Sequence, residues 1–157
     1  MPALSRRAVL ALMLAMPALS ACGDGRDDPE VGRAAPAEAG SPAIRARVDR
    51  WADHYDVPRD LVHRVVRRES NYNPAARNGP YWGLMQIHPR TAQTMGFRGQ
   101  PRDLLDADTN LKYAVKYLRG AWLVARGDKD EAVRWYARGY YYEAKRLGLL
   151  EETGLRG

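Results

Sequence analysis

Glu69 is the acidic residue of this 157-residue sequence whose surroundings best suit acid–base chemistry. Val62, Val65 and Val66 recur at helical spacing, and Glu69 continues their apolar stripe at its C-terminal end. The dipole at a helix C-terminus disfavours negative charge, and apolar neighbours disfavour ionisation, so both should raise the pKa of this carboxyl. A raised pKa suits a general acid that works near neutral pH. Taken alone, the pattern also fits an acid that pairs with a neighbouring Arg.

The sequence after Glu69 narrows these alternatives. Ser70 follows directly, and a turn containing Asn73-Pro74-Ala75 leads to the tetrad Gly83-Leu84-Met85-Gln86 and then to Pro89. This order and spacing resemble the soluble-type lytic transglycosylases. A Glu-Ser pair alone is not specific, but the pair and the tetrad at this separation would rarely arise by chance. The resemblance covers about residues 44–147.

The resemblance implies an all-α, lysozyme-like domain whose groove holds a peptidoglycan strand. It places Glu69 at the bond between N-acetylmuramic acid and N-acetylglucosamine. Ordinary glycosidases use two carboxylates, whereas the motif here supplies one. Glu69 would first protonate the leaving oxygen and would then accept a proton from the muramic acid 6-hydroxyl, which gives a 1,6-anhydro product.

The resemblance also implies contacts between the substrate and residues near Glu69. Ser70 would lie near the cleaved linkage, Gln86 would position an N-acetyl group, and Tyr136 would donate to Glu69 or to the sugar. Each has a structural alternative: a helix-end residue for Ser70, a backbone-bonding loop residue for Gln86 and the core edge for Tyr136. Met85 would pack beneath the groove or contact substrate, and Trp82 would narrow the cleft or form a sugar platform.

The last motif departs from the family pattern. The family usually shows Ala-Tyr-Asn, a variable residue and Gly, whereas this chain has Trp135, Tyr136, Ala137, Arg138 and Gly139. Because Ala137 replaces this Asn, the chain lacks a side chain that could hydrogen-bond to the substrate or to the catalytic loop. Arg138 either supplies the lost donor or is a solvated Arg.

Other chemistries find less support in the sequence. Asp103, Asp106 and Asp108 crowd the start of the helix that contains Asn110, where acids cap exposed amides, so we do not expect a second catalytic carboxylate. By the resemblance Asn110 is a buried residue. The three His residues do not occur at a metal-ligand spacing, and we expect neither a metal nor a cofactor.

The N-terminal region has the composition of an export signal. Arg6 and Arg7 precede an uncharged apolar run that ends at Leu19-Ser20-Ala21-Cys22, which resembles the bacterial lipobox, and Cys22 is the only Cys. We therefore expect a lipoprotein signal peptide at residues 1–21 with lipid attachment at Cys22. An unmodified Cys beside an ordinary cleavage site is the alternative. The paired Arg also leaves both the general secretory and the twin-arginine routes open.

The rest of the chain divides into a tether and one domain. Residues 22–42 contain almost no large apolar side chain and should form a flexible tether. Residues 43–157 should form the single domain, with helices that start near Ile44, Pro58 and Pro89 and no long alternating strand. Consecutive Tyr140, Tyr141 and Tyr142 cannot all face one site on a helix.

These features predict a protein of the periplasm, anchored to a membrane through its N-terminal lipid. Gly23 stands where inner-membrane lipoproteins often have Asp, which favours the outer membrane. The net charge of +6 lacks the clustered pattern of nucleic-acid binding, so we expect peptidoglycan strands as the partner, with envelope machinery as a further one. Two alternatives remain: a glycan-binding protein that has lost catalysis, and a structural component of an envelope assembly.

Overall fold

The computed structural model describes residues 40–155, and the expected signal peptide, Cys22 and most of the expected tether lie outside this range. The described residues form an all-α domain, which confirms the expected fold class. Its elements are α1 (Pro42–His54), α2 (Arg59–Ser70), β1 (Arg77–Asn78), β2 (Tyr81–Trp82), α3 (Pro89–Thr94), the 3-10 helix η2 (Pro101–Leu105), α4 (Ala107–Val124), α5 (Lys129–Arg138) and α6 (Tyr141–Leu147). None of these helices has the length and apolarity needed to span a bilayer.

The domain starts slightly earlier than its sequence suggests. Ser41 caps α1, since its hydroxyl oxygen accepts a hydrogen bond from the Ile44 amide at 3.2 Å, and Pro42 occupies the first helical turn. The Gly40 amide donates to the Tyr72 carbonyl at 3.2 Å. The last three residues assigned to the tether therefore belong to the fold, because a short polar cap carries little hydrophobic signal.

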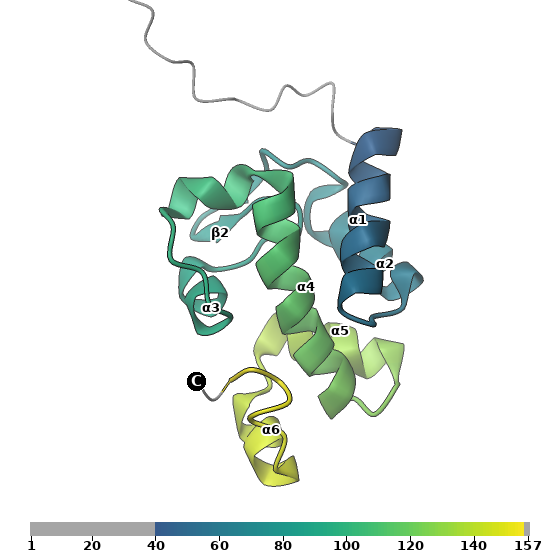
Figure 1. Cartoon of the computed structure of the whole chain (residues 1–157), viewed down its shortest axis with the longest axis vertical. Coiled ribbons are helices and arrows are strands. Elements are labelled where there is room, and N and C mark those ends of the chain that lie inside the picture. The colour runs from purple at the N-terminus through teal and green to yellow at the C-terminus, as the bar shows by residue number, and fades with distance from the viewer. Residues whose placement is uncertain (1–39, 156–157) are drawn as a thin grey trace, which may run out of the picture. The chain divides into compact units, whose positions relative to one another are not determined.

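The long helix α4 is the centre of the domain (Figure 1). It contacts α1, α3, η2, α5 and α6, and α1 also packs against α2. The interface residues are fully buried, among them Val48, Leu61, Leu111 and Leu118. This apolar interior fixes the end of α2, where Glu69 lies, relative to the helices behind it.

A short hairpin links α2 to α3. Strands β1 and β2 pair antiparallel, with Arg77 opposite Trp82 and Asn78 opposite Tyr81, and a two-residue turn joins them. Gly79 in that turn has a positive φ of 56°, a conformation that glycine adopts without a side-chain clash. The hairpin fixes the positions of Tyr81 and Trp82 beside the end of α2.

Candidate active site

Glu69 lies in the last turn of α2 at the edge of a surface pocket of about 370 Å³. Its side chain is 25% exposed, which lets the carboxyl meet a ligand while its apolar neighbours exclude much of the water. The other residues that line this pocket come from α2, the hairpin, the following loop and α5: Arg68, Asn78, Tyr81, Gln86, Tyr136 and Ala137.

The environment of Glu69 favours its protonated form. Burial raises the pKa of the carboxyl above its usual value, and the nearby Arg68 guanidinium opposes this rise without cancelling it. Arg68 Nε lies 3.6 Å from Glu69 Oε1. The predicted pairing with an Arg and the predicted rise in pKa thus occur together, and burial dominates.

Ser70 connects the end of α2 to the tetrad loop. Its hydroxyl donates to the Leu84 carbonyl at 2.7 Å, and the Val66 carbonyl lies at 3.3 Å. Ser70 does not line the Glu69 pocket. This geometry corresponds to the structural alternative for Ser70, whose hydroxyl holds the tetrad loop beside the end of α2.

Asn110 supports the same loop from below. Its side chain is fully buried and makes three hydrogen bonds: Oδ1 accepts from the Met85 amide, and Nδ2 donates to the Trp82 and Leu104 carbonyls. The expected burial of Asn110 is confirmed. The Met85 side chain is also fully buried and lines neither pocket, which agrees with the predicted packing beneath the groove and not with the alternative of a substrate contact.

Gln86 is held in place by its own amide group. Nε2 donates to the Ala76 carbonyl at 3.1 Å and to the Gly83 carbonyl at 2.9 Å. Both amide hydrogens are thereby used, so the group left for a ligand in the pocket is the carbonyl oxygen. An acceptor at this place suits the N–H of an N-acetyl group.

Tyr136 links α5 to the tetrad loop. Its hydroxyl donates to the Met85 carbonyl at 2.8 Å, so the predicted donation to Glu69 or to the sugar is not what the structure shows. Burial, with Glu69 and Tyr117 nearby, raises the pKa of Tyr136 well above its usual value. The hydroxyl therefore keeps its proton at neutral pH, and its oxygen can still accept a hydrogen bond.

Trp82 lies outside the two pockets, whereas both roles suggested for it, a narrowed cleft and a sugar platform, place its ring at the cleft. The Arg77 guanidinium lies over its ring at 4.0 Å, the residue is partly buried against the core, and it lines neither of the pockets beside Glu69. The preceding Tyr81 is 46% exposed and lines both. Alternation along a strand explains the difference, since neighbouring side chains point to opposite faces.

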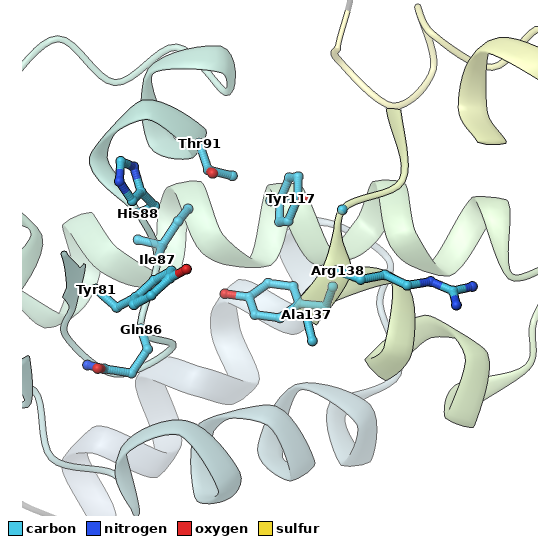
Figure 2. Close-up of a pocket in the computed structure, with 10 residues that line it drawn as sticks. Tyr81, Gln86, Ile87, His88, Thr91, Tyr117, Ala137 and Arg138 are labelled. Carbon is cyan, nitrogen blue, oxygen red and sulfur yellow. The ribbon is translucent and has the colours of Figure 1, made fainter. Parts of the chain in front are cut away.

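Figure 2 shows residues that line a second pocket, of about 250 Å³. The two pockets adjoin, because they share Tyr81, Gln86, Tyr136 and Ala137, and we call them together the groove. Glu69 lines the first of them. The remaining lining of the second pocket comes from the start of α3, from α4 and from the end of α5: Ile87, His88, Thr91, Tyr117, Arg138 and Gly139.

The Ala137 position is open on the groove. Ala137 is exposed and lines both pockets, and its side chain ends at Cβ. The Arg138 guanidinium extends away from the second pocket (Figure 2). It lies over the Trp135 ring, 3.8 Å from the ring centroid. Arg138 thus does not replace the missing Asn side chain.

The three candidate second carboxylates lie elsewhere. Asp106 caps α4 by accepting from the Thr109 amide at 2.8 Å, and Asp103 accepts from the Gln100 amide at the start of η2. Asp108 binds Arg50 at 2.7 Å and the Trp51 indole N–H at 2.8 Å. Among the residues that the structure describes, Glu69 is the only carboxylate that lines the two connected pockets.

A family model for the transglycosylase SLT domain matches residues 47–148, and the chain belongs to this family. The match includes Glu69, the tetrad and the α5 motif, and confirms the resemblance inferred from sequence. Membership points to an enzyme that acts on peptidoglycan. No solved structure matches the chain.

Three residues of the Glu69 pocket were not predicted from sequence: Arg68, Asn78 and Tyr81. Arg68 precedes Glu69 at the helix end, and its guanidinium can therefore approach the Glu69 carboxylate. Asn78 and Tyr81 are brought to the pocket by the hairpin, and two-residue strands leave no periodic pattern to detect. An aromatic residue beside the Gly79-Pro80 turn was the available signal for Tyr81.

Proposed function

We propose that this chain is a peptidoglycan lytic transglycosylase that cleaves the MurNAc-GlcNAc β-1,4 bond without water and leaves 1,6-anhydro-MurNAc ends. The observation that carries this proposal is that Glu69 alone, among the carboxylates of residues 40–155, lines the groove. Hydrolysis by two carboxylates needs a second acid on the opposite side of the bond. An intramolecular nucleophile removes that need, because it is already held beside the anomeric carbon.

The reaction would use Glu69 twice. In its protonated form, which burial favours, Glu69 donates a proton to the glycosidic oxygen as the bond to the anomeric carbon breaks. The resulting carboxylate accepts the proton of the muramic acid 6-hydroxyl while that oxygen bonds to the anomeric carbon. The enzyme ends as it began, with protonated Glu69, and no water is consumed.

Neighbouring groups would position the substrate for these steps. The Gln86 carbonyl oxygen faces an N-acetyl N–H, since its amide hydrogens are engaged by the backbone. Ser70, Asn110 and Tyr136 fix the loop that carries Gln86 relative to Glu69, and correct relative placement accounts for much of the rate in a reaction of this kind.

The proposal is tested by digesting purified peptidoglycan with the full-length chain, followed by borohydride reduction and mass spectrometry of the fragments. We expect anhydro-muramyl ends that borohydride does not reduce. Reducible ends would contradict the proposal and indicate hydrolysis. Binding without any release would instead support the alternative of a glycan-binding or envelope-assembly protein on this fold.

Glu69→Gln is the informative variant in this experiment. Losing the acid and base should lower the rate by about 100-fold or more. A carboxyl whose pKa is raised by folding destabilises the fold as pH rises through that pKa, so Glu69→Gln should be at least as stable as the parent at neutral pH. Glu131→Gln, the same change at an exposed residue of α5 paired with Arg134, is the matched control and should keep full activity.

We also propose that the mature protein is attached to the periplasmic side of a membrane, with the outer membrane favoured, through lipid on Cys22. The support is the lipobox-like sequence that ends at this single Cys. Metabolic labelling with a fatty acid tests the proposal. The parent should be labelled and Cys22→Ala should not, whereas an unlabelled parent would contradict it.

A further inference from the structure

Tyr81 stands out among the groove residues because it is a large, exposed ring with no assigned role. Only three large hydrophobic side chains among residues 40–155 are exposed, namely Tyr81, Tyr141 and Tyr142. Of these, Tyr81 alone lines the groove, where it borders both pockets at their junction. A tyrosine ring offers an apolar face and a polar hydroxyl, which together match the C–H face and the hydroxyl groups of a sugar.

The position of the ring is set from two sides. The backbone is fixed by the hairpin, in which Tyr81 pairs with Asn78. The ring packs edge-on against the His88 imidazole, with centroids 5.9 Å apart and planes at 77°. An oriented ring loses less conformational entropy when a ligand stacks on it than a freely rotating one would.

The Tyr81 hydroxyl is free to bind a ligand. Within the described residues its only side-chain interaction is the contact with His88. By contrast, the donor hydrogens of Tyr136 and Gln86 are already given to backbone carbonyls. Among the four residues that line both pockets, Tyr81 is thus the one whose side-chain donor is not engaged by the protein.

The open space at Ala137 lies across the groove from this hydroxyl. Figure 2 shows the Tyr81 hydroxyl directed toward the side of the pocket formed by the end of α5, where Ala137 lies. Ala137 ends at Cβ and supplies no hydrogen bond from the position at which the family pattern has Asn. A donor projecting from the hairpin can take over the contact that this wall lacks.

We propose that Tyr81 is a substrate-binding and specificity-determining residue: its ring stacks on an amino sugar of the glycan strand, and its hydroxyl makes the hydrogen bond that Ala137 cannot. The inference rests on the proposed function for its ligand, an alternating strand of N-acetylglucosamine and N-acetylmuramic acid. In this chain, Tyr81 of the hairpin would thus make the hydrogen bond to substrate that Ala137 of the α5 motif, across the groove, cannot make.

The test measures binding separately from cleavage. All variants are made in the full-length Glu69→Gln protein, and calorimetry measures their affinity for a purified peptidoglycan tetrasaccharide. Tyr81→Ala should weaken binding about ten-fold and Tyr81→Phe, which keeps the ring, about three-fold. Tyr142→Ala, the same truncation at a tyrosine that is 84% exposed and outside the groove, is the control and should bind like the parent.

Adding Ala137→Asn to Tyr81→Phe provides the sharper readout. If the Tyr81 hydroxyl stands in for the missing side chain, the Asn amide should restore the affinity that Tyr81→Phe loses. A merely structural role for Tyr81 would not produce this rescue. Parental affinity for Tyr81→Ala, or a loss in Tyr81→Phe that Ala137→Asn does not recover, would overturn the inference.

Failure of this inference can be distinguished from failure of the proposed function. If the parent releases anhydro-muramyl fragments while Tyr81→Ala binds normally, the inference falls and the function stands. If the parent releases nothing while binding depends on Tyr81 and is rescued at position 137, the proposed reaction falls and the role of Tyr81 stands.

Discussion

The two walls of the groove differ in how their side chains are used. On the wall formed by the tetrad loop, Gln86 makes internal hydrogen bonds, and Ser70 and Asn110 hold the loop from behind. On the opposite wall, formed by the end of α5, Tyr136 supplies the bond to the loop while Ala137 is open. The family motifs therefore serve largely to build the site, and much of the surface open to a ligand comes from residues that the motifs do not include.

This contrast assigns different consequences to changes on the two walls. Substitutions beneath the tetrad loop should damage stability and activity together, because the loop is part of the buried structure. Substitutions of side chains that only line the groove, such as Tyr81, should alter ligand binding with little effect on folding. The following predictions test this division, from the largest expected effect to the smallest.

Gly83→Ala should be the most damaging change. Gly83 has a φ of 72°, and an added Cβ would lie 2.3 Å from both Asn110 Nδ2 and the Leu104 carbonyl oxygen. We expect a loss of about 2–5 kcal/mol in the free energy of unfolding, measured by urea denaturation, together with loss of activity. Gly79→Ala is the matched control.

Gly79 also has a positive φ, of 56°, but a Cβ added there would meet nothing within 4 Å, so Gly79→Ala should cost only about 1–2 kcal/mol. Equal losses for the two variants would mean that backbone strain, and not the packing beneath the loop, sets the cost. The loop would then be less tightly supported than we infer.

Tyr136→Phe removes the hydrogen bond that joins α5 to the tetrad loop and leaves the rest of the side chain in place. The variant leaves the buried Met85 carbonyl without its hydrogen bond from Tyr136, at a cost of about 1–2 kcal/mol. Turnover should fall several-fold because Gln86, next in the loop, is held less precisely. Steady-state kinetics measures the effect. A turnover number equal to that of the parent would show that the Tyr136–Met85 hydrogen bond does not position the loop.

Arg68→Ala should change the pH dependence of activity. In the proposed reaction cleavage requires protonated Glu69, so activity should fall as pH rises through the pKa of that carboxyl. The Arg68 guanidinium lowers this pKa, and its removal should move the alkaline limb of the profile to higher pH. High salt should diminish the difference from the parent, because it screens this partly exposed pair. If the alkaline limb moved to lower pH, the assignment of that limb to the Glu69 carboxyl would be contradicted.

Arg138→Ala should have the smallest effect. The guanidinium lies over Trp135 outside the groove, so its loss should cost about 0.5 kcal/mol of stability and leave peptidoglycan release unchanged. A marked loss of release, with the fold intact, would show that Arg138 does supply the donor missing at Ala137.

The sequence predicted the helical framework and the position of Glu69 on its helix well. The stripe of Val62, Val65 and Val66 identified α2 and the face that carries Glu69, because helical periodicity follows directly from burial. Asn110 could be recognised as buried through its place in the family pattern. The predicted rise in the pKa of Glu69 also followed from its position on an apolar face.

The use of individual polar side chains was harder to predict. Ser70 and Tyr136 make bonds to backbone carbonyls of the tetrad loop, and such partners depend on tertiary placement that sequence spacing does not encode. Trp82 and Tyr81 illustrate a second difficulty. One of two adjacent aromatic residues must face inward, and the two-residue strand that decides between them is too short to show a pattern.

The central claim, that Glu69 cleaves the glycan without a second carboxylate and without water, is tested most directly by digestion in water labelled with heavy oxygen. The account predicts anhydro-muramyl ends that contain no label, since the new bond to the anomeric carbon comes from the substrate's own hydroxyl. Labelled muramyl ends released by the parent and absent with Glu69→Gln would show that water is the nucleophile, and would contradict the account.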